Sequence, residues 1–87
     1  MTYDPKSLSV LAYANGFTLW HYRTGTSLVD LTQPGYLDPA QDVLRAGDII
    51  LVNSRQACRH NAALILVASS DRLGVRLSVM GQSLNQP

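Results

Sequence analysis

The stretch GYLDPAQDVLRAGDIILV (residues 35–52) specifies more local structure than any other part of the chain. Asp38 is a good helix N-cap, and the proline after it suits the first helical position, where no backbone N–H is needed. Gly47 can adopt the left-handed conformation that ends a helix. The run DIILV (48–52) is β-branched and aliphatic, which is typical of a central strand. The stretch therefore predicts a short helix over residues 38–46, followed directly by a buried strand.

Short apolar segments bounded by turn residues make up most of the remaining chain. Asn15-Gly16 is the strongest hairpin signal, because this pair readily takes the positive φ angles of a tight turn. The polar segment 53–61 predicts a long hairpin connection. Several short strands with one short helix predict an all-β fold, either a small antiparallel β-sandwich or a partly open barrel. The predicted strands span residues 8–14, 17–24, 27–31, 48–52, 63–69 and 74–80.

The length of 87 residues is enough for a single core, so residues 1–87 are predicted to form one domain. Residues 1–7 contain Asp4-Pro5 and no apolar periodicity, which predicts a flexible or partner-ordered N-terminal arm. Because a core of this size provides little net stability, association with further copies or with a partner would stabilise the fold.

The charge balance disfavours two classes of partner. Seven Lys and Arg against six Asp and Glu give a net charge of +1. Proteins that bind nucleic acid or a membrane surface usually carry a much larger positive charge. Only 15% of the residues are charged and 46% are hydrophobic, so contact with other protein is favoured. No signal peptide pattern opens the chain, and no apolar run approaches the ~20 residues of a membrane span. We therefore expect a soluble protein, synthesised in the cytoplasm.

Few residues are suited to catalysis or metal binding. Cys58 and His60 would face the same way on an extended segment, as a nucleophile and its base do, but no third group is placed to orient the histidine. As the only cysteine, Cys58 also cannot form an intramolecular disulfide. One cysteine and two histidines are too few for a structural zinc site. We expect no enzymatic activity, no metal and no cofactor.

Two other groups of polar residues are candidates for binding. Arg55, Arg59 and His60 form the most basic segment, which could hold phosphate or acidic side chains. Two arginines without interleaved aromatic residues are more typical of a solvated loop than of a nucleic-acid site. Asp48 is a single carboxylate at a strand entrance, so we expect it to accept hydrogen bonds from nearby backbone amides.

Large aromatic and apolar residues are the remaining candidates for binding a protein. Aromatic residues are common anchors of protein interfaces, but in so small a protein they can equally form the core. Tyr3 is the only aromatic side chain in the expected arm, and so its only large anchor. The candidate protein-interface residues are Tyr3, Trp20, Tyr22, Tyr36 and Leu37.

Three segments together, LWHYRT (19–24), GYLDPA (35–40) and VLRAGDIILV (43–52), resemble a family of small structural proteins encoded by tailed bacteriophages and prophages of proteobacteria. The family pattern is a Trp-x-Tyr-Arg-Thr strand, a Gly-Tyr-Phe turn, a short helix, and Leu-Arg-x-Gly-Asp before a hydrophobic strand. Leu37 stands here where Phe is usual, and Asp38-Pro39 replaces the common Asn-Asp. The resemblance covers about half of the chain.

This resemblance implies a virion component without catalytic residues. The role that it favours is capsid decoration, in which a cement protein, expected to be a homo-oligomer, binds the shell of major capsid protein at the virion surface and stabilises it. A tail or head-fibre module is the alternative within virions. A small ligand- or nucleic-acid-binding barrel, using the basic segment, is the alternative from another class.

Overall fold

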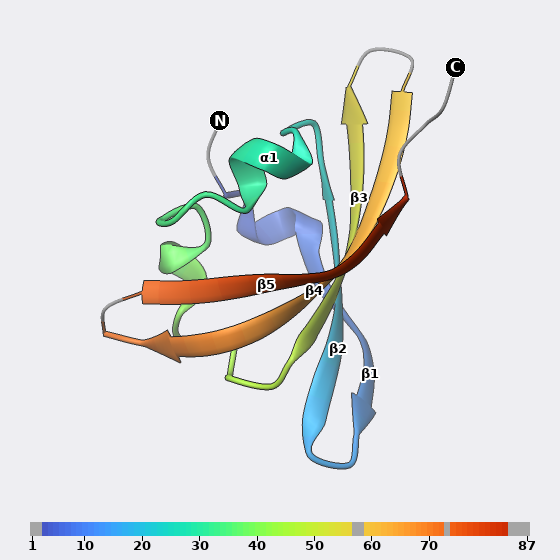
Figure 1. The fold of residues 1–87 in the computed structure, drawn as a ribbon. Helices are drawn as coiled ribbons and strands as arrows, with labels where there is room; N and C mark the ends of the chain where they lie inside the picture. Colours follow the sequence, from blue (N-terminus) through green and yellow to red (C-terminus); the bar gives the residue numbers. More distant parts are fainter. Residues whose placement is uncertain (1–2, 57–58, 73, 84–87) are drawn as a thin grey trace.

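The computed structural model describes residues 3–56, 59–72 and 74–83. Its strands form one five-stranded sheet in the order β1-β2-β3-β4-β5 (Figure 1). Strands β2 and β3 are parallel, and all other neighbours in the sheet are antiparallel. The strands are β1 (Leu8–Ala14), β2 (Phe17–Thr24), β3 (Ile49–Gln56), β4 (Arg59–Asp71) and β5 (Gly74–Ser83).

The all-β prediction is confirmed, but the predicted antiparallel arrangement is wrong at one pair of strands. Strand β2 lies parallel to β3, because the chain crosses over through residues 25–48 between them instead of turning back in a hairpin. The described strands form a single sheet that is not closed, so neither the sandwich nor the barrel is confirmed.

The first hairpin follows the sequence prediction. Strands β1 and β2 have the predicted boundaries, and Ala14 pairs with Phe17 across the Asn15-Gly16 turn. Gly16 has a φ of 98°, the positive value that this turn requires. The local turn signal is sufficient to predict the pairing next to the turn, and the register then shifts between Ala12 and Val10.

The second hairpin is longer than predicted. Residues 53–61 were expected to be a polar connection, but Asn53 pairs with Ala62 and Gln56 pairs with Arg59 in the β3–β4 ladder. That prediction is wrong because polar residues at the end of a strand extend the ladder wherever one side of the sheet faces solvent.

The predicted strand 27–31 is instead a one-turn helix, α1 (Leu28–Leu31). The Ser27 side chain accepts a hydrogen bond from the Asp30 amide at 3.1 Å, which caps the helix. Leu28 and Leu31 are buried at the i, i+3 spacing of one helical face. The prediction failed because the cap and this spacing outweigh the strand propensity of so short a segment.

The predicted helix over residues 38–46 is also wrong. Only a 3₁₀ turn forms, η2 (Asp38–Ala40), and Leu37 occupies the N-cap position without a side-chain hydrogen bond. The Asp38 carboxylate instead accepts from the Val75 amide of β5 at 3.0 Å, a tertiary bond that competes with capping. Gly47 does have the predicted positive φ, 95°.

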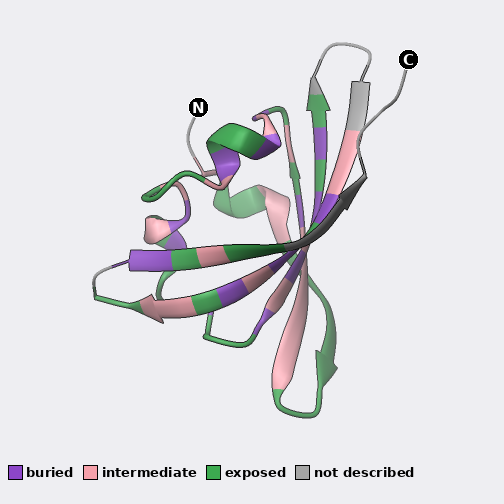
Figure 2. Ribbon diagram, in the orientation of Figure 1, coloured by how far each residue is buried: buried purple, intermediate pink, exposed green. Residues whose placement is uncertain are grey.

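One face of the sheet is covered by the helical segments η1 (Pro5–Ser7), α1 and η2, which lie together on one side in Figure 1. Side chains alternate along each strand, so every second residue points towards these segments. Figure 2 shows the resulting buried layer. The core comprises Tyr22, Leu28, Leu31, Leu37, Ala40, Leu44, Ile50, Val52, Ala63, Ile65, Val67 and Val75.

The opposite side of the central strands, here called the uncovered face, has no helix over it among the described residues. Its side chains form cross-strand rows, because neighbours in register share a face. The row through Leu19 is apolar, whereas the row through Arg23 has polar side chains on β2 and β3 and Ala62 on β4. The uncovered face comprises Leu19, His21, Arg23, Ile49, Leu51, Asn53, Arg55, Ala62, Leu64 and Leu66.

The N-terminal segment contacts the covered side of the sheet. Asp4 caps η1 by accepting from the Lys6 amide at 3.0 Å, and its own amide donates to the Tyr22 hydroxyl at 3.0 Å. The ring of Tyr3 stacks on that of Tyr22 with centroids 5.8 Å apart. Residues 3–7 are therefore in contact with the domain in this structure, and their ordering by a partner stays a prediction.

Candidate functional site

Asp48 is the most densely bonded polar side chain at the entrance to β3, and it is only 3% exposed. One carboxylate oxygen accepts from the Thr18 amide at 3.0 Å. The other accepts from the Trp20 indole N–H at 3.0 Å and from the Arg45 amide at 3.1 Å. The prediction that Asp48 accepts from backbone amides is confirmed. Its bonds join β2 to the segment that leads into β3, so its role is to hold the parallel pair together.

A second polar cluster lies where η1 and the crossover segment meet the sheet. The hydroxyl groups of Tyr22 and Tyr36 are 3.1 Å apart, and the Tyr36 hydroxyl lies 3.2 Å from that of Thr26. The two tyrosine rings meet edge to face at 6.4 Å. Because the Tyr22 hydroxyl also accepts from the Asp4 amide, this cluster ties three separate segments to the core.

Burial and the hydrogen bond with Tyr36 raise the pKa of Tyr22 from 10.0 to about 12. Because the folded-state pKa is above the unfolded value, the neutral hydroxyl stabilises the fold fully below pH 10, and this contribution is lost as the pH rises towards 12. Burial also raises the pKa of Tyr3, so ionisation of Tyr3 contributes to the same loss of stability at alkaline pH. We expect the free energy of unfolding to fall across this alkaline range.

Chemical denaturation at a series of alkaline pH values checks this expectation. Tyr22→Phe should lower stability at neutral pH and reduce the alkaline decline, because the titrating group is removed. Tyr13→Phe is the matched control, since this side chain is 82% exposed, and it should leave the decline unchanged. A wild-type decline in Tyr22→Phe would show that Tyr22 is not responsible.

The five predicted interface residues lie in or against the core. Tyr22 and Leu37 are 1% and 3% exposed, and Tyr3, Trp20 and Tyr36 are partly buried and pack on the core cluster. The structure brings Tyr3, Tyr22 and Tyr36 together, whereas Trp20 is bonded to Asp48. A core role accounts for all of these contacts, and the interface role of these residues stays a prediction.

Sequence reasoning missed an exposed apolar group on β1. Val10, Leu11 and Tyr13 are 37%, 53% and 82% exposed, and we call them the hairpin patch. Figure 1 shows the β1–β2 hairpin extending beyond the helical segments. The signal in the sequence was the Asn15-Gly16 turn, since residues just before a hairpin turn on an edge strand have few neighbours to cover them.

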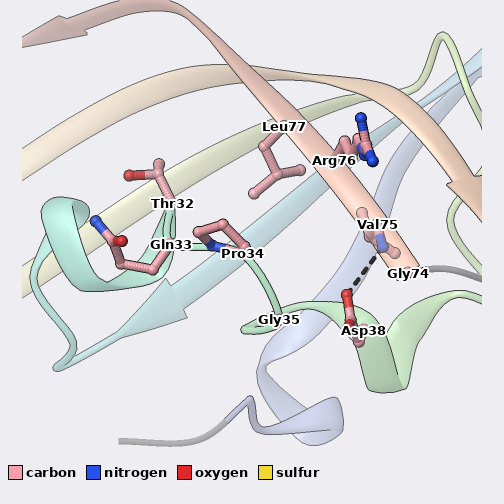
Figure 3. Close-up of a pocket in the computed structure, with 9 residues that line it drawn as sticks. All are labelled: Thr32, Gln33, Pro34, Gly35, Asp38, Gly74, Val75, Arg76 and Leu77. Carbon is pink, nitrogen blue, oxygen red and sulfur yellow. Dashed lines mark hydrogen bonds between the residues drawn. The ribbon is translucent and has the colours of Figure 1, made fainter.

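A cavity of about 430 Å³ lies between the loop after α1 and β5 (Figure 3). Three of its four polar side chains have hydrogen-bond partners. Thr32 donates to the Leu28 carbonyl at 2.9 Å, the Gln33 amide donates to the Val29 carbonyl at 3.1 Å, and Asp38 accepts from the Val75 amide. The fourth, Arg76, is exposed on β5, and a single free polar side chain is fewer than the several convergent polar groups that typify a ligand site.

A smaller hollow of about 280 Å³ lies at the basic end of the uncovered face. His21, Arg23, Asn53 and Arg55 line it, together with Ser54 and Asn61. His21 Nε2 lies 2.6 Å from Asn53 Oδ1, so these two side chains are held against each other. Arg23 and Arg55 also line an adjacent hollow of about 320 Å³. We call Arg23 and Arg55, with these two hollows, the basic site.

The structure describes only part of the other basic and catalytic candidates. Cys58 and the side chains of Arg59 and His60 lie outside the described residues. The backbone register places His60 opposite Arg55. Within the described ranges, no three His, Cys, Asp or Glu residues form a group that could hold a metal ion.

No protein-family model matches the chain, and comparisons with curated proteins and with solved structures found no match. In the described part of the chain, no helix is long and apolar enough to cross a membrane.

Proposed function

We propose that this chain is a capsid decoration protein of a tailed bacteriophage, which binds the assembled shell of major capsid protein as a homo-oligomer. The resemblance of its LWHYRT, GYLDPA and VLRAGDIILV segments to small phage structural proteins supports the virion role. The observation that carries the binding function is the hairpin patch, in which three large apolar side chains are exposed on one projecting strand.

The chemistry of the hairpin patch suits protein contact. A tyrosine supplies a large, stiff apolar surface together with a hydroxyl that can bond at the edge of an interface. Val10 and Leu11 add apolar area on the same edge strand. Contacts of this size are weak singly, and they become strong when several copies bind neighbouring subunits of a symmetric shell. A cement protein therefore needs no cleft and no catalytic residue.

Co-sedimentation with expanded capsid shells tests the proposal. The wild-type protein should sediment with shells, and the decorated shells should release DNA at a higher temperature than bare shells. Leu11→Ser/Tyr13→Ser should weaken binding by about tenfold or more, because buried interface anchors commonly contribute over 1 kcal/mol each.

Val29→Ser/Val43→Ser is the matched control, since these side chains are 69% and 48% exposed and belong to neither strand of the hairpin. It should bind as the wild type does. Wild-type protein that does not sediment with shells, or that sediments without stabilising them, would rule out decoration and favour the tail or head-fibre role. Equal loss of binding in both double variants would rule out the hairpin patch as the contact.

A further inference from the structure

Arg23 and Arg55 point to the same side of the sheet from adjacent parallel strands. Arg23 is in register with Asn53, and Arg55 follows two residues later on β3, so all three share the uncovered face. Both arginines are exposed, and both line the two hollows of the basic site. Their guanidinium groups are thus accessible at a concave part of the surface.

No carboxylate neutralises this pair. Among residues 3–56, 59–72 and 74–83, neither Arg23 nor Arg55 takes part in an ion pair. None of the chain's six acidic residues lies on β2 or β3, and the one on β4, Asp71, is its last residue, at the far end from the basic site. The acidic residues are Asp4, Asp30, Asp38, Asp42, Asp48 and Asp71. The basic end of the uncovered face therefore carries an uncompensated positive charge in a chain whose net charge is only +1.

The surroundings of the two arginines distinguish between anionic partners. Nucleic acid binding usually needs an extended tract of basic residues that follows many phosphates. Here Asn53, in the row of Arg23, is bonded to His21 in the next row. That next row also contains Leu51 and Leu64, which is 41% exposed, and the row beyond it is apolar. A short cationic end next to apolar residues matches a protein surface that has carboxylates beside an apolar area.

We propose that Arg23 and Arg55 form a carboxylate-binding site through which the uncovered face docks on an acidic surface of a partner protein. Guanidinium groups bind carboxylates through paired N–H donors, and two of them around one hollow can hold adjacent acidic side chains. The inference rests on the proposed function only in taking the partner to be a protein.

An NMR titration of the full chain with a hexaglutamate peptide at low salt tests this inference without capsids. Backbone amides around Arg23, Asn53 and Arg55 should shift on addition of peptide. Arg23→Gln/Arg55→Gln should reduce the affinity about fivefold, a total of about 1 kcal/mol, because two exposed charge pairs are lost and each is weak in water. Binding should weaken as salt is added, since exposed charges are screened.

Arg45→Gln/Arg72→Gln is the matched control, because both side chains are exposed and lie outside the uncovered face. It removes the same charge and should retain wild-type affinity. Equal weakening in the two double variants, or no shifts near the arginines, would overturn the inference.

Two further ligands separate carboxylate from phosphate. Inorganic phosphate and a thymidine oligonucleotide should bind less tightly than the peptide at equal ionic strength. Tighter binding of the oligonucleotide at the same residues would overturn the protein assignment in favour of nucleic acid, and equal affinity for inorganic phosphate would overturn it in favour of a general anion site. Because no shell is present, a negative result in this titration does not contradict capsid attachment through the hairpin patch. A negative result in the co-sedimentation experiment likewise does not contradict carboxylate binding at the basic site.

Discussion

Asp48→Ala should lower the free energy of unfolding by about 3 kcal/mol or more. Its carboxylate is the acceptor for three donors, the Thr18 amide, the Arg45 amide and the Trp20 indole. Each donor left without a partner in a partly buried site costs roughly 1–3 kcal/mol. Urea denaturation followed by tryptophan fluorescence measures the loss, and Trp20 reports directly on the altered site.

Asp48→Asn gives a graded test of the same bonds. The Asn carbonyl can keep the two bonds to Trp20 and Arg45, but its amide then faces the Thr18 N–H, so a loss of about 1.5–3 kcal/mol is expected. Asp42→Asn makes the same substitution at an exposed carboxylate and should change stability by less than about 0.5 kcal/mol. Similar stabilities for the two Asn variants would refute the structural role of Asp48.

Gly74→Ala should destabilise the domain by about 2 kcal/mol or more. Gly74 has a φ of 121°, and a Cβ there would lie 2.7 Å from the Asp38 Cγ and 2.8 Å from Oδ2. Asp38 cannot move away without losing its bond to the Val75 amide. The variant therefore combines backbone strain with a steric clash, each costing roughly 1–3 kcal/mol.

Gly47→Ala isolates the strain from the clash. Gly47 has a φ of 95°, but a Cβ there meets nothing within 4 Å, so only about 1–2 kcal/mol is expected. In the double variant Asp38→Ala/Gly74→Ala the clash is relieved, and the combined loss should be smaller than the sum of the two single losses. Additive losses, or equal effects of Gly47→Ala and Gly74→Ala, would contradict the predicted contact.

Local signals in the sequence predicted local structure well. The Asn15-Gly16 hairpin and the positive φ of Gly47 followed from residues near one another in the chain. Asp48 was predicted to accept from backbone amides, but only its bond with Arg45 is local, and its bond with Thr18 spans 30 residues. The helix expected after Asp38 failed for a non-local reason, because the carboxylate bonds to Val75 on the last strand. The parallel β2–β3 pair was missed likewise, since no local turn encodes it.

The candidate sites also depended on contacts between residues far apart in the chain, which the sequence did not reveal. Arg55 was identified as a basic residue, but its partner Arg23 was not, because the two meet only through the parallel register of β2 and β3. Tyr22 and Leu37 were candidates for an interface because size and apolarity do not distinguish a core residue from an anchor. Exposure of Tyr13 depended on which strand lies at the edge of the sheet.

The parallel β2–β3 pair joins two parts of the sheet that can each form from local contacts. Strands β1 and β2 meet across a two-residue turn, and β3, β4 and β5 follow one another as successive hairpins, so both halves can form from nearby residues. The two halves join only along β2 and β3, where Thr18 and its acceptor Asp48 are 30 residues apart. Closing that loop costs chain entropy before any contact across it is gained. We therefore expect formation of the β2–β3 pair to limit the rate of folding, and substitutions that weaken this pair, such as Asp48→Asn, to slow folding.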